Sequence, residues 1–456
     1  GVGHAGAADG FYQSAPTYTA STDFYIVSKA GLEYFRDLVN GKDVLDAYIA
    51  SDLGKSLSRS DMRFSGKTVK LLADINLNNE IWEPISVNSD KDVFCGTFDG
   101  GNHVISNLKV VYEGSTSKAG AGLFGYIKNA VTIQNVIIDN ADISGFDCVG
   151  GVVGISSSSD TVIRNCKLTG SVSITSRSSF VGGIIGHTYA KEISGCSVEA
   201  TGGTGIYCGG TGIRVGGICG YDQYTEAVLE DCHVENIDIA MAHRYLIGGI
   251  VGTVVSGAKV IRCDVEDVNI SCNYEPNYGL IVGLVDGSSN LSIVEDCSAV
   301  NSTATGKTTE GDDTTKIANT ELVGRTGVAG SVGSSSANLV VGSDIDYDGN
   351  GKIKGGTFDV LPESAIAEGF VPAVDPNTGK TIVEADPIEG SGTEADPYVI
   401  SDLKGLKLFR DRVNAGNTYQ GKFVKLGADI DFGETVWTEG IGNYEQATLD
   451  PVKKYM

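Results

Sequence analysis

The chain has 456 residues, which is long enough for two to four compact domains or for one elongated repeat domain with appendages. Its 58 acidic residues exceed its 34 basic residues by 24, which argues against nucleic acid or an anionic membrane as a partner, since both attract basic surfaces. No run of 18 apolar residues occurs, so the sequence predicts no segment inserted in a membrane.

The first segment, residues 1–63, is predicted to hold a flexible tail, a capping helix and an insertion. No signal peptide is visible in the tail, so we expect any export or lipoprotein signal to lie outside the given sequence. Ser28 is a suitable helix N-cap, and Leu32, Phe35 and Val39 follow it at helical spacing. A short amphipathic helix at this place would cover the open end of a repeat domain.

Residues 64–345 repeat a short glycine phrase, which consists of Gly-Gly, two apolar residues and Gly. Successive copies begin at steps of 29, 32, 34, 32 and 31 residues, an interval typical of solenoids. Glycine at each corner would supply either a positive φ or room for a close backbone approach. The four clear copies and the looser ones on either side are 121–125, 150–154, 182–186, 216–220, 248–252 and 279–283.

A strand-like run with one cysteine follows the four clear copies of the phrase and the last looser one. In these runs apolar and polar residues alternate with a period of two, which indicates strands with one buried face. Strands of successive repeats must then pair in parallel, so the sequence predicts an all-β, right-handed parallel β-helix, because β crossovers are right-handed. The cysteines are Cys166, Cys196, Cys232, Cys263 and Cys297.

These periodic cysteines are predicted to form an internal column of reduced thiols. In-register neighbours on parallel strands lie close enough for a disulfide, but their parallel side chains suit its torsion poorly, so bridges are the alternative. No pairing of cysteine or histidine at zinc-ligand spacing appears. Five further cysteines fall outside the pattern: Cys95, Cys148, Cys208, Cys219 and Cys272.

Residues 346–388 are predicted to be an acidic turn and linker, and a possible calcium loop lies at their start. Asp344, Asp346, Asp348 and Asn350 place side-chain oxygens at alternate positions, as Ca²⁺ prefers. An EF-hand loop beginning at Asp346 would have glycine at its sixth position, but threonine replaces the bidentate glutamate at the twelfth. Because Asp-Gly and Asn-Gly also mark hairpin turns, a turn that binds no metal is the alternative.

The last segment, residues 389–456, is predicted to be a second, truncated copy of the cap and of the strand that follows it. Ser401 is the expected N-cap of the second helix, as Ser28 is of the first. The offset between the copies falls from 374 to 355 because the first copy carries about 19 extra residues. The segment is either a small partial module or a C-terminal cap. The matching parts are 25–40 with 398–414, 66–75 with 421–430, and Trp82 with Trp437.

Together these motifs resemble the GLUG-motif surface proteins of bacteria, many of them from gut commensals. The resemblance rests on the glycine phrases, the helix with Phe-Arg-Asp and Val-Asn, the strand ending in Ala-Asp-Ile, and the runs 96–108 and 390–400. It covers roughly three-quarters of the chain, and it implies a right-handed β-helix that acts as an adhesin or binding protein at the cell surface. It brings no established catalytic residues.

The expected function is therefore non-catalytic binding of a protein or glycan on a host or microbial surface. The alternatives are a structural stalk and a β-helix enzyme that degrades polysaccharides. Such an enzyme needs basic or carboxylate side chains grouped on adjacent rungs of one face, whereas the candidate acids and histidines are scattered in sequence, so we predict no enzyme. A binding face would expose tyrosines, for example Tyr221, Tyr224 and Tyr245. The scattered acids are Asp74, Asp99 and Asp139, and the histidines are His103, His187, His233 and His243.

Overall fold

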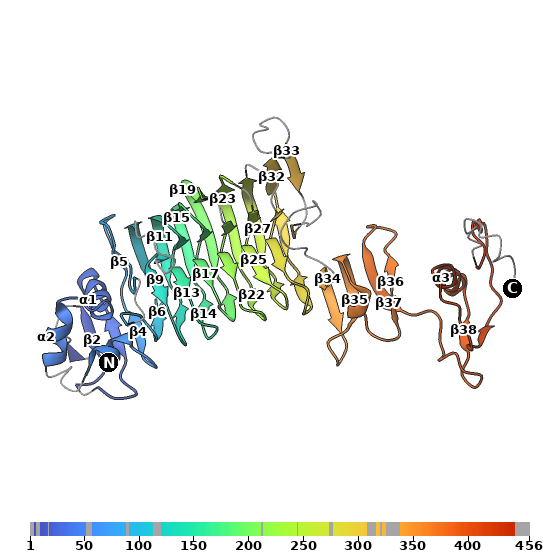
Figure 1. Cartoon of the computed structure of the whole chain (residues 1–456), viewed down its shortest axis with the longest axis horizontal. Helices are drawn as coiled ribbons and strands as arrows, with labels where there is room; N and C mark the ends of the chain where they lie inside the picture. The colour runs from blue at the N-terminus through green and yellow to red at the C-terminus, as the bar shows by residue number, and fades with distance from the viewer. Residues whose placement is uncertain are drawn as a thin grey trace, which may run out of the picture. The chain divides into compact units, whose positions relative to one another are not determined.

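The chain forms two compact units, which the computed structural model shows in Figure 1. The first unit is Gly1–Asp344 with Phe358–Pro362, and the second is Ile345–Thr357 with Glu363–Met456. The structure describes residues 4–5, 10–16, 18–51, 57–87, 91–112, 120–210, 213–243, 245–272, 277–307, 316–319, 322–324 and 338–442.

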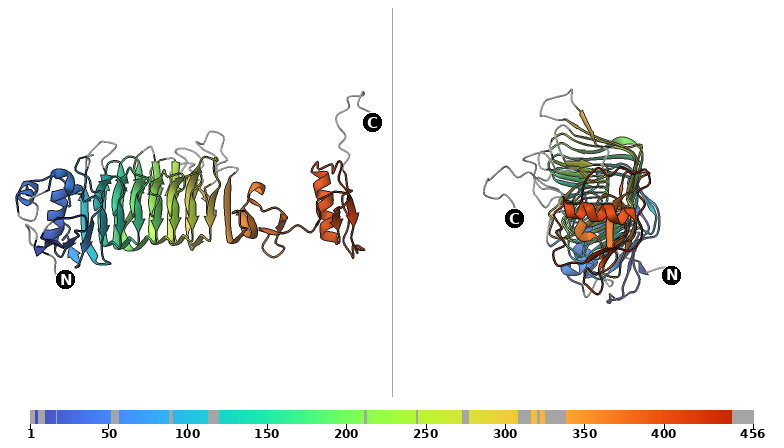
Figure 2. Two further views of the ribbon diagram at one scale, coloured as in Figure 1. Left: turned by 90° about the horizontal axis from the view of Figure 1, so that it is seen from below. Right: turned by 90° about the vertical axis from the view of Figure 1, so that its right-hand side faces the viewer.

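The first unit is a parallel β-solenoid, as predicted. Each full turn contributes one strand to each of four sheets, and each strand pairs in parallel with its counterparts one turn before and one turn after. Figure 2 shows the resulting rows of stacked strands. The cysteine runs and glycine phrases thus mark the same places on successive turns.

The strands of the solenoid are as follows. The first sheet contains β4 (Thr68–Leu71), β6 (Thr97–Asp99), β10 (Thr132–Gln134), β14 (Val162–Arg164), β18 (Glu192–Ser194), β22 (Val228–Glu230), β26 (Lys259–Ile261), β30 (Ser292–Glu295) and the start of β34 (Leu339–Tyr347). The second contains β5 (Ile75–Asn76), β7 (Val104–Val111), β11 (Ile137–Gly145), β15 (Lys167–Ser176), β19 (Ser197–Cys208), β23 (His233–Met241), β27 (Asp264–Cys272), β31 (Ser298–Val300), β32 (Thr303–Lys307) and β33 (Lys316–Asn319). The third contains β8 (Gly120–Ala121), β12 (Cys148–Gly150), β16 (Phe180–Gly182), β20 (Ile213–Gly216), β24 (Tyr245–Gly248) and β28 (Asn277–Gly279). The fourth contains β9 (Phe124–Ile127), β13 (Val153–Ser156), β17 (Ile185–Thr188), β21 (Cys219–Asp222), β25 (Val251–Val255) and β29 (Val282–Asp286).

The core of the solenoid consists of columns of apolar side chains that stack in register. The middle residue of each short strand in the first sheet is apolar and faces inward, because its two neighbours in the strand face the other way. In-register stacking therefore requires an apolar residue at one position of every turn. One such column runs Phe98, Ile133, Ile163, Ile193, Leu229, Val260 and Val294, and all seven side chains are buried.

The glycine phrases form the corner between the third and fourth sheets. Their glycines have ordinary φ angles, so close approach explains them and positive φ does not. A Cβ atom on Gly183 would lie 2.2 Å from the carbonyl oxygen of Gly217, and one on Gly217 would lie 2.1 Å from that of Gly249. Each corner thus stacks directly on the backbone of the next turn, and only glycine leaves the space for this.

Left-handed residues form the corner between the first and second sheets. Asn135, Asn165 and Asp231 have φ angles of 56°, 52° and 54°, a region that Asn, Asp and Gly tolerate best. The amide of Asn165 donates to Asn135 across 3.4 Å, and the amide of Asn135 donates to Asp99 across 3.1 Å. These side chains therefore form a ladder along the outside of the solenoid.

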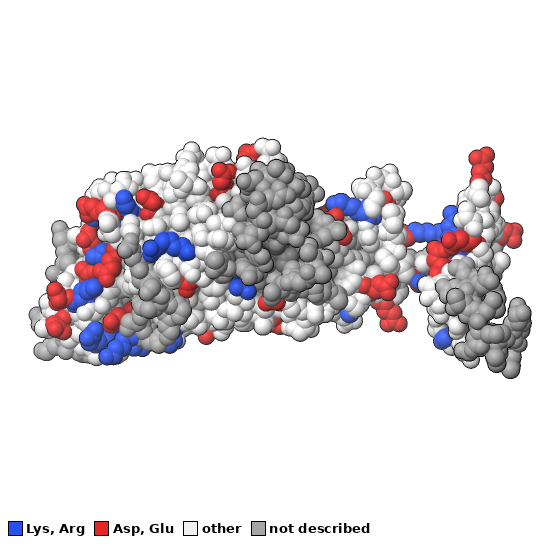
Figure 3. Space-filling view, turned by 45° about the horizontal axis from the view of Figure 1, so that its top comes forward, with Lys and Arg blue, Asp and Glu red and all other residues white. Residues whose placement is uncertain are grey.

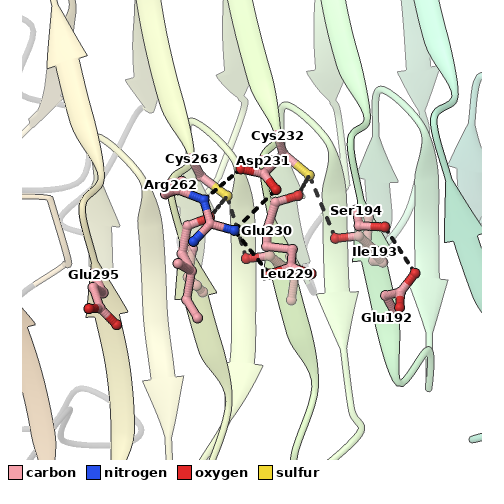
Figure 4. A network of polar contacts seen from close by, with 12 residues as sticks. Glu192, Ile193, Ser194, Leu229, Glu230, Asp231, Cys232, Arg262, Cys263 and Glu295 are labelled. Carbon is pink, nitrogen blue, oxygen red and sulfur yellow. Dashed lines mark hydrogen bonds and ion pairs between the residues drawn. The ribbon is translucent and has the colours of Figure 1, made fainter. Parts of the chain in front are cut away.

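The cysteine column lies just inside this corner, as predicted. All ten cysteines of the chain are buried free thiols. The Sγ of Cys196 donates to the carbonyl of Ile163 on the previous turn, and the Sγ of Cys232 donates to that of Ile193 (Figure 4). Burial raises the pKa of the Cys166 thiol well above its ordinary value, so this sulfur acts as a small neutral core group. Cys208 and Cys272 belong to a second column of stacked side chains, in which Met241 lies between them. The sequence analysis did not predict this column.

The N-terminal cap covers one end of the core. The predicted helix forms as α1, and Leu32, Phe35 and Val39 are buried as expected. Phe35 stacks on Phe98 of the first sheet, with ring centroids 5.8 Å apart. The cap elements are β1 (His4–Ala5), β2 (Phe11–Gln13), β3 (Phe24–Ile26), α1 (Lys29–Val39), α2 (Val44–Ala50) and η1 (Arg59–Arg63), of which α2 and η1 lie in the predicted insertion.

The second unit differs from its prediction in two respects. Residues 353–358 also read as an edge strand in the sequence, and β35 forms there, but residues 346–388 contain in addition the antiparallel pair β36 and β37, which was not predicted. The N-cap of α3 is Asp402 and not Ser401: its carboxylate accepts a hydrogen bond from the Gly405 amide, as Ser28 does from Gly31 in α1. The elements are β35 (Ile353–Val360), η2 (Glu363–Ala365), β36 (Phe370–Val374), β37 (Thr381–Ala385), β38 (Tyr398–Ile400), α3 (Leu403–Asn414) and β39 (Val424–Leu426).

Candidate functional site

The predicted calcium loop is a hydrogen-bonded turn between β34 and β35. One carboxylate oxygen of Asp348 accepts hydrogen bonds from the backbone amides of Asn350 and Lys352, both at 2.8 Å. The carboxylate of Asp346 lies 3.7 Å from the Lys354 ammonium, and the backbone amide of Asp344 donates to the Asp296 carboxylate. The turn is therefore satisfied by its own residues, and calcium binding stays a prediction.

The acids considered for catalysis have structural partners. Asp99 accepts from the Gly101 amide at 2.8 Å, as expected of a turn residue. Asp74 accepts from the Val104 amide and lies 3.4 Å from His103 Nδ1. The recorded hydrogen bonds of these two acids are thus structural contacts within and between turns of the solenoid.

One cluster of acids and histidine does form on the outer face of the second sheet. His233 pairs in register with Asp264, and Glu235 pairs with Glu266. His233 Nδ1 lies 2.6 Å from the Asp264 carboxylate, and Nε2 lies 3.0 Å from that of Glu235. The sequence analysis missed this histidine–acid cluster because the paired residues lie 31 positions apart in the sequence. A separation of 31 residues is one turn of the solenoid, and this relation could have identified the pairs.

The histidine–acid cluster is the group within the described ranges whose ligand atoms could converge on a cation. The ligand atoms of His233, Glu235 and Glu266 lie within 4.8 Å of one another. Imidazole and carboxylate ligands suit Zn²⁺ or Mn²⁺. Although burial lowers the pKa of His233, its hydrogen bonds to Glu235 and Asp264 raise this pKa above its usual value overall. Both ring nitrogens thus have partners without any ion.

An aromatic–arginine patch lies on the outer side of the third and fourth sheets. We define it by Phe180, His187, Arg214 and Tyr221, which lie on β16, β17, β20 and β21, that is, on two successive turns of these two sheets. The His187 ring stacks on Phe180 at 4.6 Å between centroids and on Tyr221 at 5.4 Å. The Arg214 guanidinium lies over the Tyr221 ring at 4.1 Å, which is within the range of a cation–π contact.

Arg214 differs from Arg164 and Arg262, two other arginines of the solenoid, because it has no acidic partner among the described residues. Within the part of the chain that the structure describes, it forms no ion pair, and its Nε atom is buried without a hydrogen-bond partner. By contrast, Arg262 binds Asp231 and Glu230 (Figure 4). Arg164 binds Glu192. Arg177, which lies over the Phe146 ring at 5.7 Å, also has no ion pair among the described residues, so the buried Nε without a partner is the feature that distinguishes Arg214.

The surroundings of the patch keep His187 uncharged. Burial lowers the pKa of His187, while its hydrogen bond to the side chain of Gln223, at 2.6 Å, opposes this effect. Arg214 is therefore the cation of the patch. Tyr221 is buried and Tyr224 is partly buried against the core, so the prediction of exposed tyrosines is wrong for these two residues. The side chain of Tyr245 lies outside the described residues.

The rest of the visible surface mixes both charges. On the face shown in Figure 3, acidic and basic side chains are interspersed near the N-terminal end of the solenoid. None of the helices in the described ranges is long and apolar enough to cross a membrane.

Comparisons with known proteins give limited similarity. No family model matches the chain. An alignment with Halomucin from Haloquadratum walsbyi is 35% identical over 134 residues and covers 27% of this chain. It covers 1% of Halomucin, so the chain spans about a hundredth of the length of this relative. A solved structure of a "putative immunoglobulin A1 protease from Bacteroides ovatus" is 19% identical and aligns with a TM-score of 0.47 over 71% of this chain and 84% of that chain. The chain is a parallel β-solenoid protein.

Proposed function

We propose that this chain is a non-catalytic binding protein of the bacterial cell surface, of the kind that the GLUG-motif resemblance implies. The observation that supports binding is the unpaired Arg214, held against aromatic rings on the side of the solenoid. The similarity to part of Halomucin supports a secreted or surface location.

The chemistry of the patch favours a glycan that carries carboxylate groups. A guanidinium binds a carboxylate through paired hydrogen bonds, which a lysine cannot reproduce. Arginine and aromatic side chains such as tyrosine also provide most of the energy in binding sites of many proteins, because they bury large surfaces. Phe180 and Arg214 are half-buried and offer a ligand one aromatic face and one positive charge, while the buried Tyr221 holds the guanidinium in place.

An array of neutral and carboxylated glycans, host matrix proteins and acidic proteins tests the proposal. We expect the wild-type chain to bind carboxylated glycans and the Arg214→Gln variant to bind them at least about tenfold more weakly, because a hydrogen bond to a charged group contributes about 1.5–3 kcal/mol. Arg177→Gln is the matched control, since Arg177 also lies over an aromatic ring, that of Phe146, at 5.7 Å. Thermal unfolding of both variants checks that the solenoid stays folded.

Other results of the same array would decide between the alternatives. If no glycan and no matrix protein binds, the proposal fails and a structural stalk is favoured. If an acidic protein binds in place of the glycans and loses binding with Arg214→Gln, the patch is correct but the partner class is wrong. The histidine–acid cluster favours a second candidate, a polysaccharide-degrading enzyme, and new reducing ends in glycans incubated with the chain would overturn the non-catalytic assignment.

A further inference from the structure

We propose that the histidine–acid cluster binds a divalent transition-metal ion, Zn²⁺ foremost, through His233 Nε2 and the carboxylates of Glu235 and Glu266. The inference rests on how two successive turns of the solenoid place these donor atoms around one point. It is independent of the aromatic–arginine patch and of the ligand proposed for that patch.

The register of β23 and β27 brings the donor atoms to one face of the second sheet. His233 and Glu235 are two positions apart in β23, so their side chains share a face of the sheet. This is the outer face, because Val234 between them is buried. Asp264 and Glu266 lie beside them in register on β27. The ligand atoms of His233, Glu235 and Glu266 therefore lie within 4.8 Å of one another, although the two strands are one turn apart.

Asp264 holds the imidazole of His233 in the orientation that a metal ligand needs. When the imidazole is neutral it carries one N–H group, and the Asp264 carboxylate, 2.6 Å from Nδ1, is the nearer acceptor for it. The lone pair then lies on Nε2, which is 3.0 Å from the Glu235 carboxylate. Metal-binding histidines commonly donate their second N–H group to a carboxylate in this way, so Asp264 acts as a positioning residue and not as a ligand.

The charges around the histidine–acid cluster favour a cation. Glu235 and Glu266 are neighbours in register on adjacent strands, where two like charges repel each other. Within the described part of the chain, neither carboxylate forms an ion pair with a lysine or an arginine. The basic residues of nearby turns are engaged elsewhere, since Lys167 binds Glu199 and Arg262 binds two acids of the corner. A divalent ion between the two carboxylates would remove their repulsion.

The donor atoms and their spacing fit Zn²⁺. Zinc binds imidazole nitrogen and carboxylate oxygen at about 2.0–2.2 Å, which places two donor atoms of one tetrahedral ion about 3.3 Å apart. His233 Nε2 and the Glu235 carboxylate, at 3.0 Å, are close to this spacing, and the exposed side chain of Glu266 can turn toward the same point. Three protein donors leave a fourth coordination position open to solvent. Mn²⁺ suits the same donors but binds such sites more weakly than Zn²⁺ does.

Calorimetric titration of the full chain with Zn²⁺ tests the proposal. We expect saturable binding that is lost in the His233→Gln variant. Glu266→Gln, which removes a ligand, and Asp264→Asn, which weakens the support of the imidazole, should each reduce the affinity at least about tenfold. Glu199→Gln is the matched control, because Glu199 lies in the same column of glutamates one turn earlier but is paired with Lys167 at 2.9 Å. This control should change the affinity by less than about threefold.

Stability provides a second measurement, because the ligands lie on two different turns. Zn²⁺ should raise the urea midpoint of the wild-type chain in proportion to the logarithm of its concentration, and the His233→Gln chain should show no such rise. Circular dichroism without metal checks that each variant is folded. Equal affinity of the wild-type and Glu266→Gln chains, binding of Ca²⁺ or Mg²⁺ as tight as that of Zn²⁺, or no binding at millimolar Zn²⁺ would each overturn the proposal.

Discussion

Replacing Gly217 by alanine is expected to destabilise the solenoid by about 3 kcal/mol or more, although alanine is a small residue. The added Cβ would lie 2.1 Å from the carbonyl oxygen of Gly249 and 2.8 Å from a methyl carbon of Val234. The first of these is backbone of the next turn, which cannot move away without breaking its own pairing. Because the same contact repeats at Gly183 and Gly249, relaxation at one corner would disturb the corners next to it.

The measurement is the urea concentration at which half of the tryptophan and circular dichroism signals are lost. Gly202→Ala is the matched control, since a Cβ at this exposed position of β19 would meet no atom within 4 Å. The free energy of unfolding of this variant should stay within about 0.5 kcal/mol of the wild-type value. Similar midpoints for the two variants would show that the glycine corner is not packed as the structure has it.

This corner also shows how far the sequence predicted the fold. The step of about 30 residues identified the solenoid, because a repeat of that length must stack on its neighbours and therefore recurs in the sequence. The reason for each glycine was harder to predict. Positive φ and close approach both require glycine, and only the position of the next turn's carbonyl distinguishes them. The left-handed positions lie instead at the opposite corner, on residues such as Asn135 and Asn165.

The functional residues were harder to predict than the core, for a related reason. A core column needs the same kind of residue at every turn, so it appears as a period, whereas a surface site needs different residues at neighbouring turns. His233 and Asp264, or Arg214 and Tyr221, carry no common motif, and their proximity follows only from the register of the strands. The N-cap of α3 shows the limit on a smaller scale. Ser401 and Asp402 are both good caps, and the offset of 374 residues from Ser28 points to Asp402, where the cap is found.

One buried acid makes the stability of this chain depend on pH in an unusual direction. Asp222, at the end of β21, is fully buried. One of its carboxylate oxygens accepts a hydrogen bond from the Tyr224 amide at 3.0 Å, and the other has no partner. Burial raises the pKa of Asp222 well above its ordinary value, because a charge without a counterion is poorly solvated there. Its neighbours in register, Thr188 and Val254, bring no positive charge.

The consequence for stability follows from where the proton binds. In the unfolded chain Asp222 loses its proton near pH 4, whereas the folded chain keeps it to a higher pH. Between these two values the folded state binds more protons than the unfolded state, so the free energy of unfolding falls as the pH rises. This contribution is largest below the unfolded pKa and is lost as the pH passes through the folded pKa.

Asp222→Asn is therefore expected to stabilise the chain at pH 8 relative to the wild type, by about 1–3 kcal/mol, and to have a smaller effect at pH 5. Asparagine keeps the oxygen that accepts from the Tyr224 amide and cannot ionise. Urea unfolding of both proteins at pH 5 and pH 8 measures the difference in their free energies of unfolding. The contributions of all other titrating groups cancel in this difference, because both proteins contain them. The Asp160→Asn variant, which makes the same substitution at an exposed position, is the control. If Asp222→Asn were equally stabilising or destabilising at both values, the carboxyl group would not be held as a neutral acid, and a cation near its free oxygen would have to be sought.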